Sequence, residues 1–309
     1  MPLNNNNKLA LSAYLTVCIV WGSTYLAIRI AVTDMPFLSF AGIRFFSAGL
    51  IILTVSLLKG WAFPKGWMEY RTSITAGAML LFISNGLICW AQQWIDSGLT
   101  ALLVASVPLF MGLIEVIFPG EHQLGWLGWV GLIVGFCGVA FLVSPNLSLE
   151  GNTLPAMLAV LAASLNWAAA SIYLKRRKIS GSMLPNVGIQ MFSAGVVFLI
   201  AAAVSGGISI AGASASGIGA LLYLIFIGSI LAYSAFYYML KVIPAAKAGT
   251  YAYINPIVAV VLGALILKEV VTAQTVIAAI IILAGVVLVQ LAKVKPVSSK
   301  IMPHTALKT

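Results

Sequence analysis

Arg44 is the residue whose position most clearly suggests chemistry, because it lies inside a long apolar run. It stands about seven residues into the run 37–58, roughly 10 Å along a helix from its end. A cation at that depth costs about 2.5–3.5 kcal/mol, so the guanidinium should face the interior of a helix bundle or a wet cavity. There it could bind a carboxylate with two parallel hydrogen bonds. The alternative is a structural arginine that bonds to helix-end carbonyls or extends outward to the bilayer surface.

Aromatic residues and amides at helical spacing form a second set of candidates for substrate binding. Trp21, Tyr25 and Arg29 recur every four residues and therefore share one face of a helix. Asn85 and Gln92 are seven residues apart, so they share a face as well. Such side chains could line a pocket, or the rings could pack in the bundle while the amides bond to neighbouring helices. The remaining candidates of this kind are Asn166, Trp167, Tyr233, Tyr237, Tyr251 and Asn255.

Two glutamates, Glu121 and Glu269, each follow a proline of an apolar run, Pro108 or Pro256, by thirteen residues. Both precede a further apolar run, and the dipole of a helix favours a carboxylate at its N-terminus. Capping of those helices is the favoured interpretation, with a role in gating or proton movement as the alternative. Glu115 lies within an apolar run and is the best candidate for proton coupling. The two prolines are expected to let their helices flex.

The composition is that of an integral membrane protein. Hydrophobic residues make up 61% of the 309 and charged residues 8%, with a mean hydropathy of +1.07. A soluble domain has about 45–50% apolar and about 25% charged residues. Only helices or closed barrels satisfy backbone groups in lipid, and the alternating pattern of barrel strands is absent, so we predict an all-α fold with ten transmembrane helices. The runs lie at 11–32, 37–58, 72–94, 98–118, 124–144, 154–174, 185–205, 217–239, 248–267 and 272–292.

The distribution of Lys and Arg predicts the orientation of these helices. With the N-terminus inside, fourteen of the seventeen fall in cytoplasmic segments, so the positive-inside rule places both termini in the cytoplasm. The polar tail 293–309 is then cytoplasmic. The net charge of +10 lies in short loops between apolar runs, which indicates topology and not binding to nucleic acid.

The chain contains two related copies of one unit. Gly42-Ile-Arg-Phe-Phe-Ser-Ala-Gly49 matches Gly188-Ile-Gln-Met-Phe-Ser-Ala-Gly195 at an offset of 146 residues, and the two Pro…Glu segments are 148 residues apart. We therefore divide the chain into repeats at 1–147 and 148–292. Each has five runs, an odd number, so the repeats should be inverted in the membrane, with a substrate site where they meet.

The two repeats differ at positions that should face this meeting surface. Arg44 corresponds to Gln190, and Asn85 corresponds to Tyr233. Positions that agree between the copies are expected to form the frame, whereas substrate recognition should concentrate where they differ.

These features together resemble a known family. Trp21-Gly-Ser-Thr-Tyr, Arg44-Phe-Phe-Ser-Ala-Gly, the paired Pro…Glu segments and the five-plus-five layout are similar to the EamA branch of the drug/metabolite transporter superfamily. The resemblance covers roughly residues 10–292. It implies a carrier of the bacterial inner membrane, commonly an exporter of amino acids or related metabolites, with a central cavity that opens alternately to each side.

Sequence motifs of other function classes are not found. There is no HExxH, GxSxG or Walker motif and no acidic metal cluster, so we expect neither an enzyme nor a cofactor, and ATP is not the direct energy source. The three cysteines form no CxxC pair.

We therefore expect a secondary transporter that exports a small amphiphilic metabolite by alternating access. Its partners would be that metabolite and the lipid bilayer, with proton coupling as an option. The first alternative is efflux of lipophilic drugs, for which an aromatic lining would suffice. An intramembrane enzyme acting on lipid and a channel are further alternatives. Substrate identity, direction, coupling ion and oligomeric state are left open by the sequence.

Overall fold

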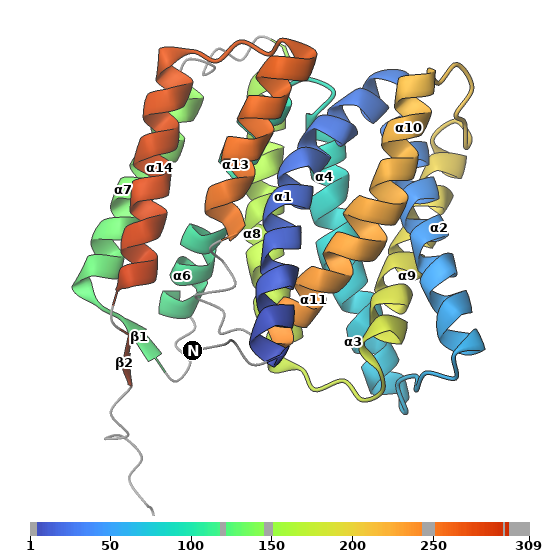
Figure 1. Cartoon of the computed structure of the whole chain (residues 1–309). Helices are drawn as coiled ribbons and strands as arrows, with labels where there is room; N and C mark the ends of the chain where they lie inside the picture. Colours follow the sequence, from blue (N-terminus) through green and yellow to red (C-terminus); the bar gives the residue numbers. More distant parts are fainter. Residues whose placement is uncertain (1–4, 118–121, 145–150, 243–250, 293, 297–309) are drawn as a thin grey trace, which may run out of the picture.

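The structure is a bundle of long, roughly parallel helices (Figure 1). A computed structural model describes residues 5–117, 122–144, 151–242, 251–292 and 294–296. The elements of the first part are α1 (Asn5–Asp34), α2 (Phe37–Leu58), α3 (Trp67–Gly77), η1 (Ala78–Ser84), α4 (Asn85–Ala91), α5 (Ser97–Val104), α6 (Val107–Ile117), β1 (His122–Leu124) and α7 (Trp126–Val143). Those of the second part are α8 (Thr153–Arg176), α9 (Met183–Val204), α10 (Ala215–Tyr223), η3 (Leu224–Leu231), α11 (Ala232–Val242), α13 (Tyr251–Leu262), η4 (Gly263–Leu267), α14 (Ala273–Leu291) and β2 (Val294–Pro296).

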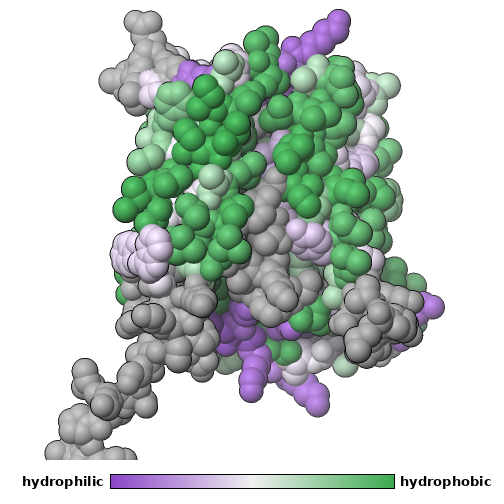
Figure 2. All heavy atoms as spheres, turned by 60° about the vertical axis from the view of Figure 1, so that its left-hand side comes forward, coloured by the Kyte–Doolittle hydropathy of each residue, from purple (hydrophilic) through white to green (hydrophobic). Residues whose placement is uncertain are grey.

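The predicted class of integral membrane protein is confirmed by the length and composition of these helices. Among the described residues, eight helices are long and apolar enough to cross a membrane, and two more, Ile254–Leu267 and Ala273–Val289, are apolar but shorter. Each overlaps one of the predicted runs. Hydrophobic side chains cover the middle of the face built around α7 and α14, and hydrophilic ones gather at its two ends (Figure 2). Exposed Trp129, Ile133 and Ile280 belong to this apolar face.

Helices α2 and α9 form the most extensive helix–helix contact among the described elements, through glycines at equivalent positions of the two copies. A Cβ atom on Gly49 would lie 2.3 Å from the backbone N of Phe192, and one on Gly195 would lie 2.2 Å from that of Phe46. The two contacts are reciprocal, because Phe46 and Phe192 are also equivalent. Glycine is needed here because two backbones meet with no room for a side chain.

Helices α7 and α14 are joined in the same reciprocal way. A Cβ on Gly285 would meet the backbone N of Gly135 at 2.3 Å, and one on Gly138 would meet that of Ile282 at 2.8 Å. The last helices of the two copies therefore pack on each other at one side of the bundle, and α2 and α9 pack at the other (Figure 1).

Several apolar runs are not continuous α-helices. The third and eighth runs contain the π-helical segments η1 and η3, which end directly before Asn85 and Ala232. The fourth run is broken between Val104 and Val107, and Pro108 lies in the first turn of α6, where proline is tolerated. Pro256 instead lies inside α13. These interruptions were not predicted from the sequence, apart from the two prolines.

The ends of the described chain emerge at the same end of the bundle (Figure 1). The first residues of α1 lie there, and so does β2, which pairs with β1 in an antiparallel register of His122 with Pro296. Apart from these two three-residue strands, the described elements are helical. The prediction of an all-α fold is therefore confirmed for the described residues, apart from these two short strands. The strand pairing joins 294–296, at the start of the predicted tail, to the segment before α7.

Candidate functional site

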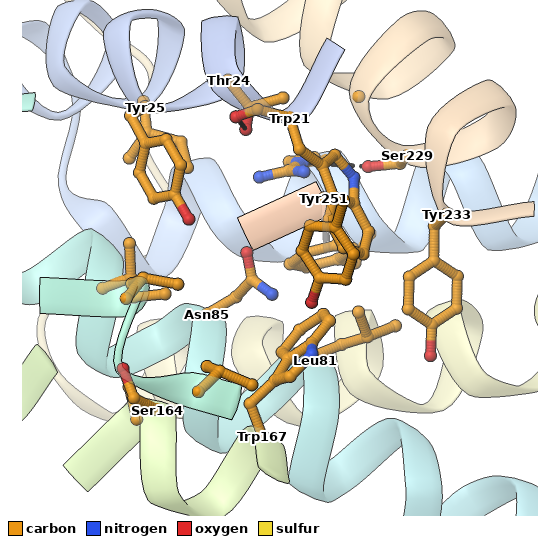
Figure 3. A pocket seen from close by; sticks show the side chains of 18 residues that line it. Trp21, Thr24, Tyr25, Leu81, Asn85, Ser164, Trp167, Ser229, Tyr233 and Tyr251 are labelled. Atoms are coloured by element: carbon orange, nitrogen blue, oxygen red, sulfur yellow. Dashed lines mark hydrogen bonds between the residues drawn. The ribbon is translucent and has the colours of Figure 1, made fainter. Parts of the chain in front are cut away.

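A pocket lies between the helices of the first part and those of the second (Figure 3). Its volume is about 60 Å³, several times the roughly 10–15 Å³ that one ordered water requires. Most of the lining is apolar or aromatic, with a few polar groups. The described lining residues are Trp21, Thr24, Tyr25, Ile28, Arg44, Phe45, Leu81, Asn85, Ile88, Val104, Val107, Ala163, Ser164, Trp167, Gly228, Ser229, Tyr233 and Tyr251.

Arg44 contributes the charge of this pocket. Its side chain is 4% exposed, and its Nε donates to the hydroxyl of Ser229 at 2.9 Å. The guanidinium carbon lies 4.6 Å from the centre of the Phe45 ring, which stabilises the cation in part. Its Nη1 is buried and has no hydrogen-bond partner among the described residues. A charge-assisted donor is therefore left available to a molecule that enters the pocket.

The repeats use their equivalent positions differently around this charge. Gln190 corresponds to Arg44 and accepts a hydrogen bond from the hydroxyl of Tyr233 at 2.6 Å. Asn85 corresponds to Tyr233 and donates to the carbonyl of Leu80 at 3.2 Å, within the π-helical segment η1. Arg44, Asn85 and Tyr233 line the pocket, whereas Gln190 supports it from behind. The two repeats thus contribute different side chains to the pocket, although the glycine contacts of α2 with α9 and of α7 with α14 are equivalent in both.

An aromatic cluster closes one side of the pocket. Trp21 and Trp167, which are equivalent in the two copies, meet edge to face with centroids 5.4 Å apart. Tyr251 meets Trp21 edge to face at 5.4 Å, and Phe236 lies 4.8 Å from Trp21 and 5.5 Å from Trp167. These rings come from α1, α8, α11 and α13, so relative movement of those helices would open or close this side. Figure 3 shows Trp21, Tyr251 and Trp167 gathered together.

Seven of the eleven predicted binding residues line the pocket, and four do not. Gln92 donates to the backbone carbonyl of Tyr25 at 3.0 Å, and Asn166 donates to Met79 O and Ser84 Oγ. With its amide oriented to satisfy both neighbours, Asn255 donates to Tyr251 O and Cys18 O. These three amides join helices, which is the structural alternative considered above. Tyr237 faces a different cavity, lined by Leu174, Lys175, Tyr237, Leu240 and Lys241.

Some lining residues were missed by the analysis of the sequence. Thr24 follows Trp21 by three residues, and Ser164 precedes Trp167 by three, so both lie one turn away on the same helix faces. Ser229 is harder to find, because its equivalent in the first copy is the apolar Leu81. Phe236, which belongs to the aromatic cluster and not to the lining, could have been included from its spacing of three residues from Tyr233. The apolar lining residues carry no signal that separates them from the rest of the bundle.

Glu269 caps a helix, but a different one from the helix predicted. Its two carboxylate oxygens accept from the backbone N–H groups of Ser97 at 2.9 Å and Gly98 at 3.1 Å, at the start of α5. The start of α14 is instead capped by the hydroxyl of Thr272, which accepts from Thr275 N at 3.1 Å. The loop before α14 therefore places the carboxylate beside an earlier helix. The hydrogen bonds of Glu269 thus connect the second part of the chain to the first.

The surroundings of this cap contain two more charged groups. Asp96 keeps part of its surface in water, yet partial desolvation raises its pKa above the usual value, and the Glu269 carboxylate raises it further. Arg29 lowers the same pKa, although less. Arg29 also donates to the backbone carbonyl of Gln92. The predicted face of Trp21, Tyr25 and Arg29 thus runs from the pocket to this charged end.

The other predicted coupling and flexing residues are placed as follows. Glu121 lies outside the described residues, and of Glu115 only the backbone, in α6, is described. Pro108 stands at the break before α6, and Pro256 stands inside α13, beside Asn255. Whether these residues couple, gate or flex stays a prediction.

Comparison with known proteins identifies the family. A model of the EamA-like transporter family matches the chain twice, over residues 8–144 and 154–291. The chain belongs to the EamA-like transporter family. Among its curated EamA-like relatives, the chain is 37% identical over 295 residues to the "Uncharacterized inner membrane transporter YedA" of Escherichia coli strain K12, covering 94% of both chains.

More distant relatives also match this chain over most of their length. The "Uncharacterized transporter YoaV" of Bacillus subtilis is 22% identical over 84% of this EamA-like chain and 88% of its own. Protein PagO of Salmonella typhimurium is 23% identical over 96% of this chain and 97% of its own. A solved crystal structure with 18% identity superposes with a TM-score of 0.64 over 91% of this chain and 96% of its own, so it shares the fold.

In this EamA-like transporter, replacing Glu269 by glutamine should lower the stability of the fold. Glutamine offers one acceptor oxygen in place of two and loses the charge that the N-terminus of α5 favours, which should cost about 0.5–2 kcal/mol. Thermal unfolding of the purified protein in detergent measures the effect. Lys268→Gln, at the exposed neighbouring position, is the matched control. Equal melting temperatures for the two variants would contradict the capping role.

Proposed function

We propose that the chain is a secondary transporter of the bacterial inner membrane, built from ten transmembrane helices in two inverted repeats, 1–147 and 148–292. Two observations support the repeats. The family model matches the chain twice in succession. The glycine contacts of α2 with α9 and of α7 with α14 are reciprocal, as a two-fold relation between copies requires. Rocking of one repeat against the other would expose the pocket to each side in turn.

The substrate is a small amphiphilic metabolite, an amino acid or a relative, which the protein exports. The observation that carries this proposal is the buried Nη1 of Arg44, a residue that lines a mainly apolar and aromatic pocket, because this nitrogen has no hydrogen-bond partner among the described residues. A carboxylate would satisfy this donor, and the rings of Tyr25, Trp167 and Tyr251 would meet the apolar part of the molecule.

Both termini lie in the cytoplasm in this proposal, and the tail 293–309 is cytoplasmic. The argument is the distribution of Lys and Arg over the loops. The aromatic cluster then lies on the cytoplasmic side of the pocket, since Tyr251 is the first residue of α13, and α13 begins at its end nearer to the chain ends (Figure 1). Glu269 and the start of α5 lie on the opposite side.

Uptake into proteoliposomes tests the function. Vesicles that contain the purified protein should accumulate labelled amino acids or their carboxylic-acid relatives faster than empty vesicles, and the initial rate should saturate with concentration. Saturation separates a carrier from a channel. Equal uptake by empty vesicles for the whole panel would contradict the proposal. Repeating the assay with a pH difference across the membrane tests proton coupling, for which Glu115, Glu121 and Glu269 are the candidates.

The aromatic cluster favours a second candidate function, the efflux of lipophilic compounds. Four rings linked by contacts with centroids 4.8–5.9 Å apart could stack on a planar apolar substrate without any ion pair. Transport that competes with lipophilic cations and is indifferent to replacement of Arg44 would support this alternative over the first.

A further inference from the structure

The charges around the pocket are unbalanced. Arg44 is the one charged residue among the described lining residues, and none of the lining residues is acidic. The described part of the chain gives Arg44 no ion pair, and its only side-chain hydrogen bond is to the neutral hydroxyl of Ser229. The pocket therefore holds one full positive charge at a depth where charge is costly.

A substrate that brings one negative charge would neutralise this pocket. A substrate that also carries an ammonium group would bring a second positive charge to within a few ångströms of the guanidinium, with no carboxylate among the described lining residues to receive it. Aromatic faces attract cations, yet this attraction is weaker than a buried ion pair and is already used in part by Arg44 on Phe45. An amine without a carboxylate would therefore meet net repulsion from Arg44.

The cavity beyond the aromatic cluster has the same sign of charge. It is lined by Lys175 and Lys241, and no acidic residue is among its described lining. Lys241 Nζ lies 5.5 Å from the centre of the Tyr237 ring. Lys175 follows Trp167 by eight residues on α8, which is about 12 Å along the helix. An anion that leaves the pocket past Trp167 would therefore meet a second favourable potential.

We infer that the pocket selects amphiphilic carboxylates of net charge −1 over zwitterions of the same skeleton, and that it rejects the corresponding amines. The inference rests on the proposed transport function and narrows its substrate class. It implies that the relatives of amino acids that lack a free ammonium group are better ligands than the amino acids themselves.

Three compounds with one branched alkyl group test the inference. They are 4-methylpentanoate, leucine and 3-methylbutylamine, with net charges of −1, 0 and +1. Binding to the purified protein is followed by tryptophan fluorescence, and transport is followed in proteoliposomes with each labelled compound. The carboxylate should bind at least tenfold more tightly than leucine, equal to about 1.4 kcal/mol, and the amine should not bind measurably.

Two variants locate the selectivity in the pocket. Arg44→Gln should remove the preference for the carboxylate. Ser229→Asp keeps Arg44 and places a carboxylate beside its Nε, so it should weaken binding of 4-methylpentanoate at least tenfold and strengthen binding of the amine. Arg71→Gln removes an exposed cation outside the pocket and should leave the preference unchanged. Thermal unfolding in detergent checks that each variant is folded.

The outcomes separate this inference from the function on which it rests. Transport of all three compounds with equal or reversed preference would overturn the charge selectivity and leave the transporter standing. Charge-selective binding without transport would leave the inference standing and contradict the proposed function. Failure of 4-methylpentanoate to bind, or a preference that neither Arg44→Gln nor Ser229→Asp changes, would overturn the inference.

Discussion

Replacing Arg44 by alanine should lower the initial rate of substrate uptake in proteoliposomes by at least about tenfold. The guanidinium is buried, and its Nη1 is left for the substrate, since its Nε already donates to Ser229. A hydrogen bond to a charged group contributes about 1.5–3 kcal/mol, which corresponds to at least a tenfold change in an equilibrium constant. The rate of the variant is divided by the amount of folded protein in the vesicles.

The stability of the variant distinguishes recognition from folding. Removing a buried cation that has no counter-ion among the described residues should not destabilise the bundle greatly, so the melting temperature should fall little or even rise. Arg71→Ala, on the exposed face of α3, is the matched control and should transport normally. A variant at Arg44 that keeps its transport rate, or loses rate only in proportion to folded yield, would show that the arginine is structural.

Replacing Gly195 by alanine should destabilise the fold through the contact of α9 with α2. The new Cβ would lie 2.2 Å from the backbone N of Phe46 and 2.5 Å from its Cα, and no side-chain rotation can relieve a clash with backbone atoms. The helices must move apart, which should cost about 1–3 kcal/mol or more. Gly49→Ala should have a similar effect, because its Cβ would lie 2.3 Å from the backbone N of Phe192.

The control for these two variants is Gly219→Ala on α10. A Cβ at Gly219 has no atom within 4 Å, and alanine is favoured over glycine in a helix by about 1 kcal/mol. Thermal unfolding and the monodisperse fraction in detergent should therefore be unchanged or improved for Gly219→Ala. They should fall for Gly195→Ala and Gly49→Ala. Three equal melting temperatures would mean that α2 and α9 are not in close contact.

The apolar runs predict the bounds of the helices well, because the thickness of the lipid bilayer fixes how long a spanning helix must be. The predicted span 37–58 coincides with α2, and the span 154–174 differs from α8 by one residue at its start and two at its end. The reciprocal glycines were visible as repeated sequence, but their contacts were not. The π-helical segments before Asn85 and Ala232 carry no sequence signal, since the same apolar residues suit an ordinary α-helix.

The site is less predictable because helical spacing gives a face but not the neighbour of that face. Asn85 and Gln92 share a spacing that suits one side of a helix, yet α4 ends at Ala91 and Gln92 donates to a backbone carbonyl of α1. Asn166 is adjacent to Trp167 but points to η1. Arg44 was identified correctly as a lining residue because a charge inside an apolar run is costly in lipid and must face the interior of the bundle, whichever helices surround it. The hydrogen-bond partner of this buried charge, Ser229, lies in the second repeat. It could not be identified without knowing how the two repeats pack together.

The central claim is that the pocket opens alternately to the two sides of the membrane. Asn85, which is partly exposed in the pocket, is replaced by cysteine in a chain whose Cys18, Cys89 and Cys137 are replaced by alanine. A small membrane-impermeant thiol reagent is then added to one side of sealed vesicles of either orientation. The account predicts modification from either side and protection by the transported compound in both cases. Modification from one side alone, with or without substrate, would contradict alternating access through this pocket.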